Sequence, residues 1–171
     1  MYRWDRLDYL KQALQLADEQ GFVPAFKVVR GAYMEKERER AQKMNYTSPI
    51  HVSKADTDNE YNQALKLCVE NIQRISICAG THNEESSQYL VDLMEEHNIA
   101  AFHPHIFFAQ LLGMSDHISF NLAKAGYNVA KYVPYGPVKA VLPYLSRRAT
   151  ENSSVKGQVG RELGLISQEL K

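Results

Sequence analysis

The chain has 171 residues, enough for one domain with a substantial core. Hydrophobic residues make up 44% and charged residues 23%, a composition that excludes a disordered or membrane-spanning protein. Its 20 basic and 20 acidic side chains balance, so no net field favours nucleic acid as a partner. Two cysteines without a CxxC motif indicate a reducing compartment or buried thiols. The start of the chain lacks the apolar segment of a signal peptide, and no apolar run approaches the roughly 20 residues of a membrane helix.

Helical and strand patterns alternate along the chain. Apolar periodicity and stop signals predict helices over residues 5–20, 35–44, 54–72, 84–97, 116–125, 138–151 and 155–170. Short apolar runs predict strands over residues 22–29, 75–80, 99–103 and 128–133. Candidate N-caps are Asp56 or Thr57 (with Glu60 completing a capping box on Thr57), Asn83 and Asp116.

The alternation predicts a parallel α/β fold. A dinucleotide fingerprint is absent, because Arg30-Gly31-Ala32 lacks the three-glycine spacing. Polar residues follow each predicted strand: Arg30 and Tyr33, Thr81 and His82, His103 and His105, Tyr132 and Tyr135. Loops after the carboxyl ends of parallel strands build the site of a β/α barrel or of an open sheet. Four β/α units are half of an eight-unit barrel, so we expect a fragment or a chain that needs a partner.

The predicted helix after Pro137 carries a polar stripe. Tyr144, Arg147, Arg148 and Glu151 share one helical face, beside an apolar stripe. One interpretation is a solvated flank with a weak Glu–Arg pair. The other is a site for a small carboxylate, because guanidinium groups bind carboxylates with paired hydrogen bonds.

Lys27 lies within an apolar strand, where a buried lysine is costly without a partner. Its amine either reaches the strand end, donates to a ligand or forms a Schiff base. In a regular strand, the side chains of Lys27 and Arg30 point to opposite faces of the sheet. Both can reach one ligand only if the chain turns near Arg30, and Gly31 permits such a turn.

Two further clusters have competing interpretations. Thr81-His82-Asn83 is either an ordinary helix cap or an anion site at a helix N-terminus. His103 and His105, with His82, have the spacing of metal ligands. However, no acidic residue lies near His103 and Pro104 indicates a turn, so no metal centre is predicted.

Five motifs together resemble the proline dehydrogenase family, the flavin-dependent proline oxidases, and their order matches the family's from about Phe22 onward. They are Lys27-Val-Val-Arg-Gly-Ala-Tyr33, Gly80-Thr-His-Asn83, Gln110-Leu-Leu-Gly-Met-Ser-Asp116, Lys131-Tyr-Val-Pro-Tyr-Gly136 and Tyr144-Leu-Ser-Arg-Arg-Ala-Thr-Glu-Asn152. The resemblance implies that residues 1–171 form the carboxyl-terminal half of a (β/α)8 TIM-type barrel domain, roughly strands 5 to 8 with their helices. Since the family's earlier strands supply further site residues, we expect the isolated chain to be inactive or very weak.

The resemblance also implies roles for individual residues. Lys27, where many members have arginine, matches a basic residue near the reactive part of FAD, and with Tyr132 is the expected catalytic pair. Arg147, Arg148, Tyr144, Leu111 and Tyr33 match substrate-binding positions. Besides Lys27, the positions that match cofactor-binding residues are Arg30, Gly31, Ala32, Thr81, His82 and Glu151; Glu151 also matches an acid that fixes the arginines.

The implied reaction is FAD-dependent oxidation of L-proline to 1-pyrroline-5-carboxylate, the first step of proline catabolism to glutamate. Implied partners are quinone or another electron acceptor, and pyrroline-5-carboxylate dehydrogenase as recipient of the product. The expected location is the bacterial cytoplasm or the periphery of the inner membrane. Two alternatives remain open: a non-catalytic half-barrel that needs a partner chain, and a Schiff-base aldolase built on Lys27.

Overall fold

The computed structural model describes residues 1–154, apart from the side chains of residues 147 and 149–154. The helix predicted over residues 155–170 therefore lies outside the described residues. Four strands form one parallel sheet in the order β1 (Ala25–Val29), β2 (Ser76–Gly80), β3 (Ile106–Leu111) and β4 (Val129–Tyr132). This arrangement confirms the predicted parallel α/β class.

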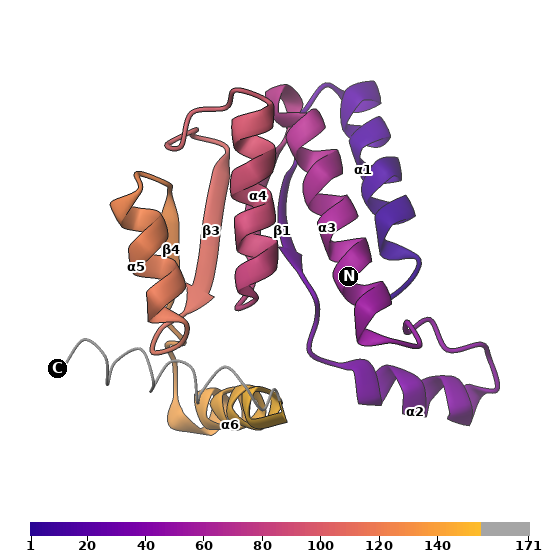
Figure 1. Cartoon of the computed structure of the whole chain (residues 1–171). Coiled ribbons are helices and arrows are strands. Elements are labelled where there is room, and N and C mark those ends of the chain that lie inside the picture. Colours follow the sequence, from indigo (N-terminus) through magenta and orange to yellow (C-terminus); the bar gives the residue numbers. More distant parts are fainter. Residues whose placement is uncertain (155–171) are drawn as a thin grey trace, which may run out of the picture.

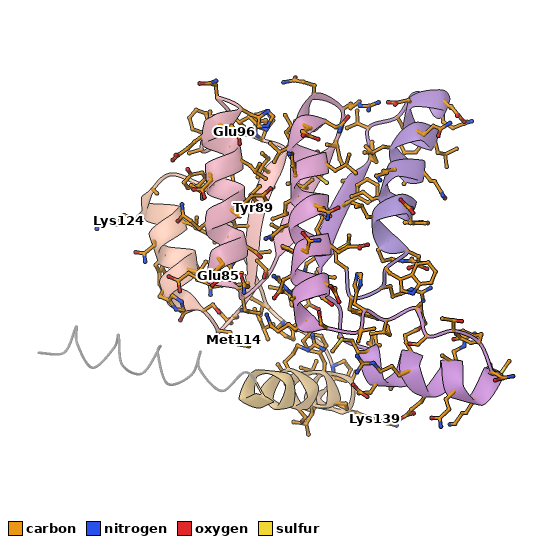
Figure 2. All side chains as sticks on the ribbon, turned by 45° about the vertical axis from the view of Figure 1, so that its right-hand side comes forward. Glu85, Tyr89, Glu96, Met114, Lys124 and Lys139 are labelled. Carbon is orange, nitrogen blue, oxygen red and sulfur yellow. The ribbon has the colours of Figure 1, made fainter. Side chains whose placement is uncertain are left out.

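Helices α1 (Arg6–Gln20), α3 (Lys54–Glu70), α4 (Glu84–Glu96) and α5 (Asp116–Lys124) lie on one side of the sheet, and a short 3₁₀ turn, η1 (Ile72–Arg74), precedes β2 (Figure 1). Two helices, α2 (Met34–Met44) and α6 (Val138–Ser154), lie beyond the carboxyl ends of the strands (Figure 1). Figure 2 shows Glu85 at the end of α4 nearer α6 and Glu96 at the far end. The N-terminus of α4 therefore faces the carboxyl ends of the strands.

Strand alternation divides the sheet residues between two faces. Val28, Ile77, Ala79, Ile106 and Phe108 are buried against α1, α3 and α4 in the core. Residues of the opposite parity include Lys27, Val29, Phe107 and Tyr132, which are exposed, and Cys78, which is half-buried. The structure thus has one packed face and one open face, and Lys27 and Tyr132 belong to the open one.

The third strand begins later in the chain than the apolar pattern predicts. Residues 99–103 form no strand, and β3 begins at Ile106. Asn98 adopts a left-handed conformation with φ of 54° and starts a turn. Asn128 then holds the end of this segment, because its amide donates to the carbonyls of His103 and Ile106. The apolar run that follows is longer and supplies the paired strand.

Two predicted helix caps are also wrong. Helix α3 begins after Ser53, which forms a capping box with Asp56, so neither Asp56 nor Thr57 is the N-cap. Glu60 instead accepts from the backbone of Leu7. Helix α5 begins at Asp116 itself, after Ser115 in a left-handed conformation. The predicted cap at Asn83 is confirmed, because its side chain accepts from the backbone N–H of Ser86.

Candidate active site at the carboxyl ends of the strands

A row of alternating cationic and aromatic side chains crosses the open face and joins it to α6. The Lys27 ammonium lies 4.9 Å from the centre of the Tyr132 ring. Tyr132 meets Tyr144 edge to face at a centroid distance of 6.0 Å, and the Arg148 guanidinium lies 5.5 Å from the Tyr144 ring. Lys27, Tyr132, Tyr144 and Arg148 are called the aromatic row below. The row places an aromatic pair between two cations.

Arg30 is the centre of a second cluster, behind the carboxyl end of β1. Its Nε donates to Asp58 at 2.5 Å, and its two terminal nitrogens donate to Thr81 and Ser86, each at 2.8 Å. The guanidinium also lies 4.3 Å from the Tyr61 ring. This Arg30 cluster ties β1 to α3, α4 and the loop before α4.

Thr81 and His82 are held from the other side by the end of β3, the loop after it and the first turn of α5. The buried Gln110 donates to the Thr81 carbonyl and accepts from the Ser119 hydroxyl. His82 Nδ1 is 2.9 Å from the Ser115 hydroxyl oxygen. Lys131 anchors the same loop through Met114 and Asp116; Figure 2 shows Met114 on the side of the molecule nearest α6.

Residues 31–33 form the turn that follows β1. Gly31 has a φ of 117°, and a Cβ there would lie 1.6 Å from an atom of the Tyr2 ring, so only glycine fits. Ala32 is half-buried, whereas Tyr33 is exposed with the Lys36 ammonium 5.5 Å from its ring. The turn leaves Arg30 against the helices, while Lys27 stays on the open face.

The remaining predicted site residues fall into two groups. Leu111 is buried at the end of β3, paired in register with Tyr132. Arg147 and Glu151 belong to α6, but their side chains lie outside the described ones.

Two expectations need correction. Lys27 is an exposed strand residue, because the face that it occupies has no described helix over it. His103 and His105 precede β3, so they lie at the amino ends of the strands, where Ser76 Oγ is 2.7 Å from His105 Nδ1. His82 is therefore at the opposite edge, and the described residues contain no group of three metal-ligating side chains.

Sequence reasoning missed Asp58, Ser86, Gln110 and Ser115. Asp58 precedes the apolar Tyr61 by three residues, a spacing that places both on the core-facing side of α3. Gln110 was detectable as a polar residue in an apolar strand. Nothing in the local sequence indicates the contacts of Ser86 or Ser115, whose partners lie 56 and 33 residues away along the chain.

Charges at this edge shift two pKa values in predictable directions. Burial favours a higher pKa for the Asp58 carboxyl, but hydrogen bonds from Lys54 and Arg30 outweigh it and hold the pKa below its usual range. Burial raises the pKa of the Cys78 thiol, while nearby Lys27 acts in the opposite direction. Asp58 is therefore an anion between two cations at neutral pH.

Comparison with known proteins gives a consistent match. The sequence model of the proline dehydrogenase family matches residues 1–161. The chain is 40% identical over 170 residues to proline dehydrogenase 1, mitochondrial, of Caenorhabditis elegans, covering 96% of this chain and 28% of that protein. It is 41% identical over 174 residues to hydroxyproline dehydrogenase of Xenopus laevis, covering 99% of this chain and 37% of that protein.

A solved structure has the same fold. Proline utilization A from Bdellovibrio bacteriovorus, inactivated by N-propargylglycine, matches with a TM-score of 0.82 and 28% identity. The match covers 88% of this chain and 16% of that chain. None of the described helices has the length and apolar character needed to cross a membrane. The family match and the curated relatives, which are named as dehydrogenases and hence as oxidoreductases, show that this chain belongs to the proline dehydrogenase family.

Proposed function

We propose that the protein carrying this chain oxidises L-proline to 1-pyrroline-5-carboxylate, with FAD as the bound oxidant. The observation that carries the proposal is the aromatic row. Its arginine can bind the carboxylate of proline, and its two tyrosine rings can pack against the saturated ring of proline. Family membership and the names of the relatives support the same substrate class.

The substrate end of the site is Arg148 with the two tyrosines. A guanidinium binds a carboxylate by paired, charge-assisted hydrogen bonds. Arg148 projects from α6 beside the Tyr144 ring, and the proposal gives Arg147, on the same helix, a second carboxylate contact. Tyr132 and Tyr144 would pack on the proline ring, Leu111 would complete an apolar wall, and Tyr33 would contribute an aromatic edge.

The cofactor end fits a ligand with a flat ring and a pyrophosphate. The open face offers Lys27 beside small or apolar neighbours, Cys78 and Gly80. The polar edge offers Arg30, whose guanidinium has five N–H groups and uses three of them in the contacts described. In this proposal Lys27 lies near the reactive ring, and the pyrophosphate half contacts Arg30, Gly31, Ala32, Thr81 and His82. Glu151 would steady the arginines of α6 at the same site.

When bound, FAD would supply a two-electron oxidant: it would accept a hydride from proline Cδ, the ring carbon beside the nitrogen and away from the carboxylate, while the nitrogen would lose a proton as the C=N bond of the product forms. The residues of the chain orient the reactants for that transfer. Arg148 fixes the carboxylate, the tyrosine rings exclude water from the proline ring, and the Lys27 cation stabilises negative charge that develops on the oxidant.

The same proposal includes a barrel. We infer that β1 to β4 correspond to strands 5 to 8 of a (β/α)8 barrel whose lumen is the open face, and that residues 1–171 belong to its carboxyl-terminal half. Support comes from the parallel order, the helices on one face and the polar carboxyl edge. The chain spans 28% of the nematode relative, so the activity is proposed for the full-length protein.

Quinone is the proposed electron acceptor, reached by peripheral association with the membrane, and pyrroline-5-carboxylate dehydrogenase is the proposed recipient of the product. Hydroxyproline is the second candidate substrate, because the frog relative named for it is as similar as the nematode one. A turnover assay of the full-length protein with FAD, an artificial electron acceptor and each amino acid tests both. We expect faster turnover of L-proline; turnover of neither would contradict the proposed function.

A further inference from the structure

Asp58 is the carboxylate that fixes Arg30, and it lies outside every motif that carries the family resemblance. One of its oxygens accepts from Arg30 Nε at 2.5 Å. The other accepts from the Lys54 ammonium, also at 2.5 Å, one helical turn away on α3. Both side chains of the Arg30–Asp58 pair are mostly buried, at 21% and 28% exposure. The pair is therefore shielded from solvent more than an ordinary surface salt bridge.

The contacts around Arg30 restrict its guanidinium to one plane. Asp58 holds Nε, Thr81 and Ser86 hold one hydrogen of each terminal nitrogen, and Tyr61 lies against the flat face. Of the five N–H groups, one on each terminal nitrogen has no partner among the described residues. An arginine held in this way offers those two N–H groups without first losing side-chain entropy.

Thr81 links this arrangement to the next loop. Its hydroxyl accepts from Arg30 Nη1 and from the backbone N–H of Asn83, the N-cap of α4. Ser86, in the first turn of α4, donates to Asn62 of α3 while it accepts from Arg30. A change at Asp58 would therefore alter the aim of Arg30 while leaving the other anchors of α4 in place.

We propose that Asp58 is a positioning residue that aims Arg30 at the pyrophosphate of the bound dinucleotide. This inference rests on the proposed function, because that function supplies the cofactor. Asp58 does not touch the ligand; it acts through Arg30. The hydrogen bonds that Lys54 and Arg30 donate to the Asp58 carboxylate keep this carboxylate charged.

The test measures affinity for two probes in the full-length protein without cofactor: FAD, and riboflavin, which has no phosphate. Asp58→Asn removes the charge but keeps the shape of the side chain. We expect FAD to bind about tenfold more weakly and riboflavin to bind unchanged, since the lost interaction is one charge-assisted hydrogen bond. The matched control is Asp8→Asn, an exposed aspartate of α1 whose partner among the described residues is Lys11, and we expect it to change neither affinity.

A double-mutant cycle with Arg30→Gln tests whether Asp58 acts through Arg30. In the Arg30→Gln background, Asp58→Asn should weaken FAD binding no further. Equal losses for FAD and riboflavin, or an undiminished effect of Asp58→Asn in that background, would indicate a purely structural role and overturn the inference. A wild-type protein that binds neither probe would contradict the proposed function itself.

Discussion

The ammonium of Lys27 lies 4.9 Å from the centre of the Tyr132 ring, although these residues belong to the two edge strands of the sheet. In a flat sheet, three strand spacings of about 4.8 Å would separate them by roughly 14 Å. Lys27 pairs in register with Cys78, which in turn pairs with Phe107 of β3. Tyr132 pairs with Leu111, which lies four residues further along β3 than Phe107. That offset adds roughly 13 Å along the strands, so a flat sheet would hold the two Cα atoms roughly 20 Å apart, farther than the two side chains can span.

The sheet therefore curves and tilts around its open face, as the wall of a barrel does. Curvature brings β1 and β4 toward each other and makes one concave surface of residues that a flat sheet would separate. Lys27 from β1 and Arg148 from α6 reach the same tyrosine pair for this reason.

Arg148→Gln should raise the KM for L-proline about ten- to a hundredfold and change kcat much less. The glutamine cannot form paired, charge-assisted bonds with the carboxylate, and each such bond contributes about 1.5–3 kcal/mol. Steady-state kinetics of the full-length protein with proline as varied substrate give both constants. The matched control is Arg74→Gln, which removes an arginine paired with Asp18 and Asn71 outside the site. An unchanged KM in Arg148→Gln would rule out Arg148 as the carboxylate ligand.

The two cysteines should react with iodoacetamide at very different rates in the folded protein. Burial raises the pKa of Cys68 to about 12, so hardly any thiolate forms there at neutral pH. Cys78 lies half-buried on the open face, where burial also raises its pKa but Lys27 opposes the shift. We expect alkylation of Cys78 alone, faster as the pH rises because the thiolate fraction grows, and slower with FAD bound.

Peptide mapping after timed alkylation identifies which thiol has reacted. A Cys78→Ser variant is the control, since it should lose the fast reaction entirely. Alkylation of Cys68 at the rate of Cys78 in folded protein would contradict the burial that the structure shows. An alkylation rate of Cys78 that is the same with and without FAD would contradict a cofactor on the open face.

Gly31→Ala should destabilise the fold far more than Gly21→Ala. A residue with a side chain at a φ of 117° is strained by about 1–3 kcal/mol, and the added Cβ would also overlap the Tyr2 ring. Gly21 has a φ of 71° with open space around it, so alanine there costs roughly 1–2 kcal/mol from the backbone alone. Urea unfolding monitored by circular dichroism measures the difference.

Adding Tyr2→Ala to Gly31→Ala separates the two causes. It should recover the part of the loss that comes from the clash and leave the backbone strain. If the Gly31 and Gly21 variants were equally stable, the contact between Gly31 and Tyr2 would have no energetic weight.

Gln110→Leu should lower the free energy of unfolding by about 1–3 kcal/mol, because the Thr81 carbonyl and the Ser119 hydroxyl each lose a partner in a buried place. Gln88→Leu is the control: Gln88 is exposed and, within the described part of the chain, its side chain bonds Asp92, so its replacement should change stability by less than about 0.5 kcal/mol. Combining Gln110→Leu with Ser119→Ala should cost less than the sum of the single changes. Additive losses would mean that the two side chains are not coupled.

The periodicity of the sequence predicted most helices, the parallel sheet and the turn that joins β4 to α6. It failed where two apolar segments compete for one strand. Residues 99–103 and Ile106–Leu111 both suit a strand, and only pairing with β2 and β4 selects the second. This one misplacement also moved His103 and His105 to the wrong edge of the sheet.

Candidate residues of the site were predictable where they belong to compact motifs, as with Tyr132, Tyr144 and Arg148, and their roles stay predictions. The Arg30 cluster was not, because its hydrogen bonds join residues 28, 51 and 56 positions apart. Such contacts depend on how α3 and α4 pack beside β1, and tertiary packing leaves no local pattern in the sequence.

In the proposed function, proline delivers electrons to a flavin held at the carboxyl ends of these strands. The most direct measurement is the visible absorption spectrum of the full-length protein purified with FAD, recorded without oxygen before and after addition of L-proline. We expect a flavin band that bleaches with proline, and bleaches only at much higher proline concentration in Arg148→Gln. A protein without bound flavin, or a flavin band that proline leaves unchanged, would contradict the proposed function.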